Sequence, residues 1–362
     1  MQAAPRRVGH PCTALVPVTG AGHRGPKLDT VAHVTSCPDD IEDSINGAYS
    51  AVVARGLARH PSDSRKAVHT VDPRAAETTD LMPAAFIGHG NPMNALEVNR
   101  YTTAWQAFGA AVPRPRVILV VSAHWYVNAT AVTAMPRPRT IHDFYGFPQA
   151  LFDVDYPVPG LPELADEISE VVHPTWIGAD HDSWGIDHGT WSVLLHAFPD
   201  ASIPVVQLSI NADKPLDHHL ELGAKLAALR RRGVLVVGSG NVVHNLRAMD
   251  WSRADDGYDW ARRFSDESRE LMLTEPTEFA TLDAHPDFRS AVPTPDHFIP
   301  ALYFAGLAGA QDAPNLNVLV DGYAYGSLTM TAYTLDLDCT PVQGVGGSPL
   351  PPADVPPDGS NI

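Results

Sequence analysis

The chain reads PVVQLSI at 204–210, PLDHHLELGAKLAALRRR at 215–232 and VLVVGSG at 234–240, and this stretch decides the fold. Its outer segments are apolar runs of strand length, whereas the middle segment has the pattern of a helix that begins near Pro215 and ends before Gly233. Two strands joined through a helix form the connection that parallel strands require. Because both strands are apolar throughout, we expect them to be buried on both faces of the sheet.

The same alternation of strands and helices extends in both directions from this stretch. Further strands are predicted at 84–88 (AAFIG), at 117–123 (VILVVSA) and within NVLVDG and SLTMTAYTLDL near the end of the pattern. Helices are predicted at 102–112, 161–172, 259–273 and 296–308. The sequence therefore predicts an α/β fold, with a single domain whose central, mostly parallel sheet is covered by helices on both faces.

The two ends of the chain lack such a pattern. Residues 1–81 are rich in Pro, Gly, Ser, Arg and Asp, and only 41–60 could form a short helix. Residues 339–362 form a Pro/Gly-rich tail with little to bury. We therefore expect a disordered or weakly structured N-terminal extension over 1–81, a folded domain over 82–338 and a disordered tail over 339–362.

The composition argues against several classes of protein. The formal net charge of the 362 residues is −17, which disfavours a nucleic-acid partner because phosphates attract basic surfaces. No apolar run reaches the roughly 18 residues that a membrane helix needs. The three cysteines (Cys12, Cys37 and Cys339) form no CxxC zinc motif. We expect a cytoplasmic protein with neither nucleic-acid nor membrane partners, and the oligomeric state is left open.

Histidines follow three of the predicted strands. His89 stands between two glycines after AAFIG, His124 follows VILVVSA, and His244 follows VLVVGSG by a few residues; His297 lies in PTPDHFIP, where a helix begins. Ligands of open α/β sheets bind beyond the carboxyl ends of the strands. A single histidine after a strand is usually an ordinary residue, but three that converge on one edge suggest a metal site, and flanking glycines allow backbone and substrate to approach closely.

Seven motifs occur in an order that is known from one enzyme family. They are GHGNPMN, VVSAHW, TIHDFYGFPQALFDVDYPVPG, WGIDHGTW, VQLSI, GSGNVVHNLR and PTPDHFIP. Over about 82–338 the chain resembles the 4,5-DOPA extradiol dioxygenase branch of the class III ring-cleavage dioxygenases. The resemblance implies a single α/β domain with one metal ion that is held mainly by histidines.

The resemblance also implies roles for individual residues. It makes His89 and His124 metal ligands, and it puts His297 where better-known class III enzymes have a carboxylate. His244 matches the active-site histidine that serves as acid and base and can approach the metal as a further ligand. Since the third ligand would be neutral rather than anionic, the expected cofactor is one divalent metal per chain, either Fe(II) for dioxygenase activity or Zn(II).

Two further motifs leave alternatives open. His188, in WGIDHGTW, is expected to be a catalytic residue that contacts substrate or supports a ligand, and Asp187 either orients an imidazole or begins a helix before Thr190. His142 and Asp143 lie in a loop rich in aromatic residues, which either walls the substrate's ring or is simply packed. On the helix at 215–232, His218 and His219 are expected on a solvated face.

The activity that the resemblance implies is extradiol cleavage of a catechol ring. The partners would be dioxygen and a small aromatic diol similar to DOPA, and the product would be of the muconic semialdehyde type. Two alternatives remain. A zinc-dependent hydrolase would activate water with His89, His124 and His297, with His244 as base. A non-catalytic metal-binding protein could also use the same scaffold.

Overall fold

The computed structural model describes residues 81–339 and 346–349. The predicted N-terminal extension, with its candidate helix at 41–60, lies outside the described residues except for Leu81, as does most of the predicted tail. Within the described ranges, no helix is both long and apolar enough to cross a membrane.

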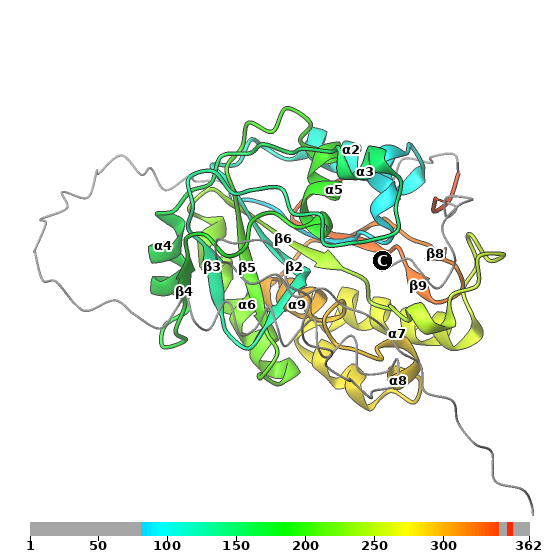
Figure 1. Cartoon of the computed structure of the whole chain (residues 1–362). Coiled ribbons are helices and arrows are strands. Elements are labelled where there is room, and N and C mark those ends of the chain that lie inside the picture. Colours follow the sequence, from blue (N-terminus) through cyan, green and yellow to red (C-terminus); the bar gives the residue numbers. More distant parts are fainter. Residues whose placement is uncertain (1–80, 340–345, 350–362) are drawn as a thin grey trace, which may run out of the picture. The chain divides into compact units, whose positions relative to one another are not determined.

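A mixed eight-stranded sheet forms the centre of the domain, with the strand order β4-β3-β5-β2-β6-β1-β10-β7 (Figure 1). Strands β5, β2, β6 and β1 are parallel to one another, whereas β10 and β7 continue the sheet in antiparallel fashion. The strands are β1 (Ala84–Gly88), β2 (Val117–Val127), β3 (Ala131–Thr133), β4 (Gly178–Asp180), β5 (Val205–Asn211), β6 (Val234–Gly240), β7 (Leu316–Val320) and β10 (Ala332–Leu335), with a separate hairpin of β8 (Tyr323–Ala324) and β9 (Leu328–Thr329).

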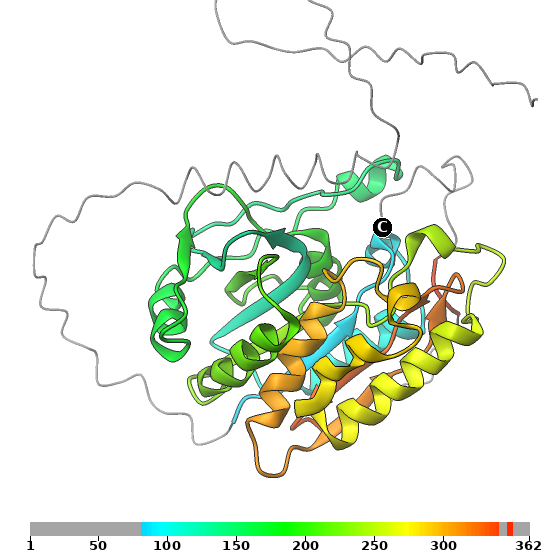
Figure 2. The same ribbon diagram turned by 90° about the horizontal axis from the view of Figure 1, so that it is seen from below.

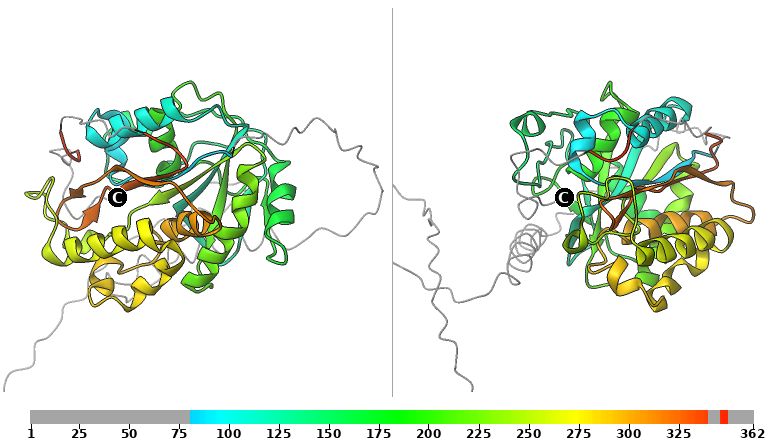
Figure 3. Two further views of the ribbon diagram at one scale, coloured as in Figure 1. Left: turned by 180° about the vertical axis from the view of Figure 1, so that it is seen from behind. Right: turned by 90° about the vertical axis from the view of Figure 1, so that its right-hand side faces the viewer.

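Helices cover both faces of this sheet, as the sequence predicts (Figures 2 and 3). Neighbouring residues of one strand face opposite sides, so that Val236 packs in one apolar cluster and Val237 in the other. The first cluster includes α4 (Leu164–Val171), α6 (Leu216–Arg230), α7 (Asp259–Thr274), α8 (Phe288–Ala291) and α9 (Ile299–Gly309). The second includes α2 (Arg100–Ala111), α3 (Gln149–Phe152) and α5 (His188–Ala197). Short 3-10 turns are η2 (Pro92–Leu96), η3 (Leu246–Ala248) and η4 (Pro276–Ala284).

Some boundaries differ from the sequence-based expectation. Helix α2 begins two residues earlier than predicted because the Asn99 side chain caps it, accepting hydrogen bonds from the backbone N–H groups of Tyr101 and Thr102. Strand β2 continues to Val127, so His124 lies within the strand instead of beyond its end. The pairing of β2 with β5 shifts between Val121 and Tyr126, and His124 falls inside this irregularity.

Candidate metal centre

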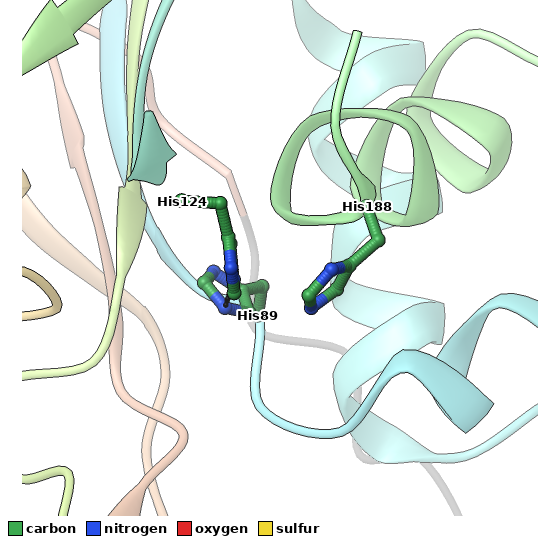
Figure 4. Close-up of side chains that lie close together, drawn as sticks. All are labelled: His89, His124 and His188. Atoms are coloured by element: carbon green, nitrogen blue, oxygen red, sulfur yellow. Dashed lines mark hydrogen bonds between the residues drawn. The ribbon is translucent and has the colours of Figure 1, made fainter. Parts of the chain in front are cut away.

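Five histidines meet at the carboxyl edge of the central strands. His89 follows β1, His124 lies in β2, and His244 follows β6; His188 is the first residue of α5, and His297 precedes α9. We call them the histidine cluster. His124 has 12% of its side chain exposed, and the other four residues are buried. Figure 4 shows His188 projecting from α5 toward the neighbouring rings of His89 and His124.

Three of these rings form a nearly equilateral triangle. The ring centres are 5.1 Å apart for His89 and His124, 5.3 Å for His89 and His297, and 5.0 Å for His124 and His297. Imidazoles that bind one ion through nitrogens about 2.0–2.1 Å away have their centres about 5 Å apart at tetrahedral angles. The ring centres of the three side chains therefore have the spacing of ligands around a single metal ion. The ligand atoms within 4.8 Å of one another form two neighbouring groups, His89, His124 and His188 in one and His244, Asp296 and His297 in the other.

Hydrogen bonds fix which nitrogen of His89 faces the centre of the cluster. Its Nδ1 lies 3.0 Å from the Ser239 hydroxyl oxygen. That hydroxyl donates its own hydrogen to the Gly189 carbonyl at 2.5 Å, so it can only accept from the ring. His89 therefore carries its proton on Nδ1 and presents the lone pair of Nε2.

Carboxylates fix other rings of the cluster in the same way. The Nδ1 of His124 lies 3.1 Å from Asp143 Oδ2, the Nδ1 of His188 lies 2.9 Å from Asp143 Oδ1, and His297 pairs through Nδ1 with Asp296. Metal-bound histidines usually donate their other N–H to such a group. These rings therefore also present Nε2 as a lone pair.

The Nε2 atoms, which face away from these hydrogen-bond partners, suit a metal ion. His89 Nε2 and His124 Nε2 lie 3.2 Å apart, and two lone pairs at this distance repel each other unless a cation lies beside both. Among the described residues, the buried Nε2 atoms of His188 and His297 have no hydrogen-bond partner. Such buried orphan nitrogens are costly unless something binds them, so the donor set suits a divalent metal that accepts imidazole ligands.

Burial also favours the neutral rings that metals bind. It lowers the pKa of His89 well below its ordinary value, and the neighbouring imidazoles lower it further. Burial lowers the pKa of His297 despite the opposing charge of Asp296. His124 is the exception: burial acts to lower its pKa, but the carboxylates of Asp143, Asp187 and Asp296 together outweigh burial and raise the pKa. For Asp143 itself, burial would raise the pKa, but His188 and His124 outweigh it and hold the pKa well below the usual range.

His244 is arranged differently from the other four rings. It stacks on His297 with the ring centres 3.5 Å apart and the planes only 5° from parallel. An imidazole binds a metal in its own plane, so two stacked parallel rings do not aim at the same ion. Within the described ranges we find no hydrogen bond to its ring, although its backbone N–H donates to the Ala291 carbonyl at 2.8 Å. Burial and the neighbouring His297 lower its pKa well below the ordinary value.

The structure brings together every histidine that the sequence singled out for the site, but the supporting acids differ. Asp187 caps α5, since its carboxylate accepts hydrogen bonds from the Thr190 backbone N–H at 3.1 Å and from the Ser122 hydroxyl at 2.7 Å. Asp187 is thus the N-cap residue of a helix. The carboxylates of Asp143 and Asp296, instead, orient the imidazoles. Sequence reasoning missed this role of both acids; the signal was an aspartate adjacent to a histidine.

The aromatic loop is packed, and it also borders the histidine cluster. The ring of His142 packs 5.5 Å from Trp191, and its Nε2 lies 2.9 Å from the Val154 carbonyl oxygen, as in a packed loop. Phe144 in the same loop lies 5.5 Å from His188, measured between ring centres, and so borders the histidine cluster.

Glycines let backbone segments approach the cluster closely. A Cβ atom on Gly189 would lie 2.7 Å from the Ser122 hydroxyl oxygen and 2.8 Å from the His124 ring, and one on Gly240 would lie 2.3 Å from the His297 carbonyl oxygen. The sequence-based expectation of a close backbone approach is met at Gly240, whereas the close approach at Gly189 was not anticipated. At both glycines, the atoms that a Cβ would meet belong to the protein itself.

Gly189→Ala should therefore disturb the site. The added methyl group must displace His124 or the start of α5, which we expect to destabilise the fold by about 1–3 kcal/mol and to weaken metal binding. Denaturant unfolding and a Zn(II) titration measure the two effects. Gly309→Ala is the control, because Gly309 is the last residue of α9, at the opposite end from His297, and its methyl group would press mainly on the Thr277 side chain. Wild-type values for Gly189→Ala in both measurements would contradict this account of the packing.

Comparison with known proteins gives the family. Residues 89–335 match the model for the catalytic LigB subunit of aromatic ring-opening dioxygenase. The chain belongs to this family. It is 48% identical over 253 residues to the 4,5-DOPA dioxygenase extradiol of Escherichia coli K12, a match that covers 69% of this chain and 93% of that protein. It is 34% identical over 243 residues to the protein of the same name from Beta vulgaris, which covers 64% of this chain and 88% of that protein.

A solved structure confirms the fold. The crystal structure of an uncharacterized Escherichia coli K12 protein matches with a TM-score of 0.62 and 42% identity, covering 70% of this chain and 99% of that chain. The α/β fold and the resemblance to extradiol dioxygenases are therefore confirmed, and the chain is a ring-opening dioxygenase of the extradiol type. The family depends on a metal, and the histidine cluster could bind one.

Proposed function

We propose that this enzyme uses dioxygen to cleave the ring of a DOPA-like catechol at the bond next to the two hydroxyl groups. We further propose that His89, His124 and His297 hold one Fe(II) ion. The observation that carries the proposal is the triangle of three ring centres about 5 Å apart, in which Nε2 of His89 and Nε2 of His124 lie 3.2 Å from each other. Relatives from Escherichia coli and Beta vulgaris are named for DOPA, which supports this substrate class. When bound, the metal supplies a Lewis-acidic centre with open positions for the catechol oxygens and dioxygen.

The protein's carboxylates compensate for the neutral ligand set. His297 stands where a carboxylate is found in other class III enzymes, but Asp296 pairs with its Nδ1. Asp143 does the same for His124 at 3.1 Å. A carboxylate on the far nitrogen increases the basicity of the nitrogen that faces the metal. Asp143 and Asp296 thus supply the negative charge that the ligands lack, each through a hydrogen bond to a ligand ring.

His244 and His188 would handle the substrate's protons and position. His244 is neutral near pH 7 because burial lowers its pKa, so it can accept a proton from a catechol hydroxyl and return it as the ring opens to a muconic semialdehyde. His188 presents a buried Nε2 without a partner among the described residues, and this nitrogen can accept a hydrogen bond from the second hydroxyl. Phe144 borders His188 and helps to exclude water from that side.

Anaerobic reconstitution tests this function. Apo protein is loaded with Fe(II) or, as the matched control, with Zn(II), and then receives DOPA or another catechol followed by oxygen. We expect stoichiometric oxygen uptake and a yellow product from the Fe(II) protein alone. Ester or amide hydrolysis by the Zn(II) protein, without oxygen uptake by either form, would support a hydrolase instead. Metal binding without either reaction would support a non-catalytic role.

A further inference from the structure

Asp143 lies between two imidazoles of the histidine cluster. Its Oδ2 is 3.1 Å from His124 Nδ1, and its Oδ1 is 2.9 Å from His188 Nδ1. The same Oδ1 also accepts a hydrogen bond from the backbone N–H of His188 at 3.0 Å. One carboxylate, of which 15% of the side chain is exposed, therefore holds a ring from β2, a ring from α5 and the first turn of α5.

This arrangement gives both rings the same tautomer. An ionised carboxylate only accepts hydrogen bonds, so both Nδ1 atoms must carry hydrogen, and in the neutral rings that bind a metal both Nε2 atoms then present lone pairs. The two ring centres are only 3.9 Å apart, and His188 Nε2 is buried without a partner among the described residues. Neither ring can exchange its tautomer while Asp143 accepts from both.

We propose that Asp143 is a positioning residue shared by two functions, because it fixes His124 for metal binding and His188 for contact with the substrate. The inference rests on the proposed function for the role of His188, but the tautomers and the metal affinity can be measured without turnover. Among the described residues, no other carboxylate has an oxygen within 4.0 Å of a nitrogen atom in each of the two rings.

An amide at this position cannot serve both rings. Asn offers one acceptor oxygen and one donor group. We expect the amide oxygen of Asp143→Asn at the Oδ1 position, because the backbone N–H and the ring of His188 both donate there. The amide NH₂ then faces His124 Nδ1, and His124 must move its proton to Nε2. This tautomer cannot bind a metal through Nε2 without rearrangement.

The variants therefore separate the two rings. Asp143→Asn should change the tautomer of His124 only and weaken Zn(II) binding about 10- to 100-fold. Asp143→Ala removes the acceptor from both rings and should change both tautomers. Asp143→Glu keeps two acceptor oxygens and should recover part of the Zn(II) affinity. Asp153→Asn is the control, since Asp153, ten residues after Asp143, is exposed and accepts a hydrogen bond from the Gln149 side chain.

The test combines a Zn(II) titration of apo protein with long-range ¹⁵N NMR of labelled histidines, assigned with His124→Gln and His188→Gln. Wild-type protein should show hydrogen on Nδ1 of both rings. The proposal is overturned if wild-type His188 carries its hydrogen on Nε2, a result that needs no variant at position 143 to fold. It is also overturned if only one ring responds to Asp143→Ala, or if Asp143→Asn binds Zn(II) as tightly as Asp153→Asn. Absence of oxygen uptake by wild type would instead count against the dioxygenase function.

Discussion

Replacing His124 with alanine is expected to leave a folded protein that has lost most of its metal. The residue lies in β2, whose backbone pairing does not depend on the side chain, while its Nε2 is 3.2 Å from that of His89. Loss of a ligand should cost more than the about 10–100-fold in affinity that follows loss of a supporting hydrogen bond. Metal analysis of purified protein, with far-UV circular dichroism to check the fold, measures both expectations.

The triangle of rings predicts the same loss for His89→Ala and His297→Ala. His181→Ala is the matched control, because His181 lies outside the histidine cluster and its ring contacts the Ala134 carbonyl oxygen at 3.2 Å. Full metal occupancy in His124→Ala would show that His124 is not a ligand. It would also contradict a metal site built on the triangle of rings.

The fold could be predicted where each element carries its own pattern. Strands β1 and β6 agree with their predicted bounds because continuous apolar runs end at glycine or polar residues. Helix α5 was predicted only as one of two alternatives for Asp187, because its residues from His188 to Leu194 are all buried, so no polar face marks the helical period. His219 was expected on a solvated face, and this was wrong. Gly223 and Gly306 let α6 and α9 pack closely, and His219 lies buried against the Tyr303 hydroxyl at 3.1 Å.

The site could be predicted in part for a related reason. Parallel strands end at the same edge, so histidines that follow them converge whatever their separation in sequence. The acids that orient these rings come from loops, and a loop has no periodicity from which its place can be deduced. Asp143 and Asp187 each stand beside a histidine in the sequence, yet only Asp143 reaches an imidazole, because Asp187 turns back to cap α5.

His244→Gln should retain most of its metal while turnover falls by about 10²–10⁴-fold, the contribution typical of a general acid or base. His244 stacks on His297 instead of pointing at the same centre, so the triangle is complete without it. Glutamine keeps a polar side chain but has no basic nitrogen to accept the catechol proton, whereas a neutral imidazole has one. The loss should therefore lie in turnover and not in metal content.

Metal analysis and oxygen-uptake rates on one preparation decide between the two roles of His244. A metal loss equal to that of His124→Ala would make His244 an obligatory ligand, and the stacked geometry would then have to rearrange when metal binds. Wild-type turnover of His244→Gln at full metal occupancy would show that His244 is neither an acid/base nor an obligatory ligand. With the metal retained and turnover lost, the proton that leaves the catechol goes to the one ring of the histidine cluster for which the described residues provide no hydrogen-bond acceptor.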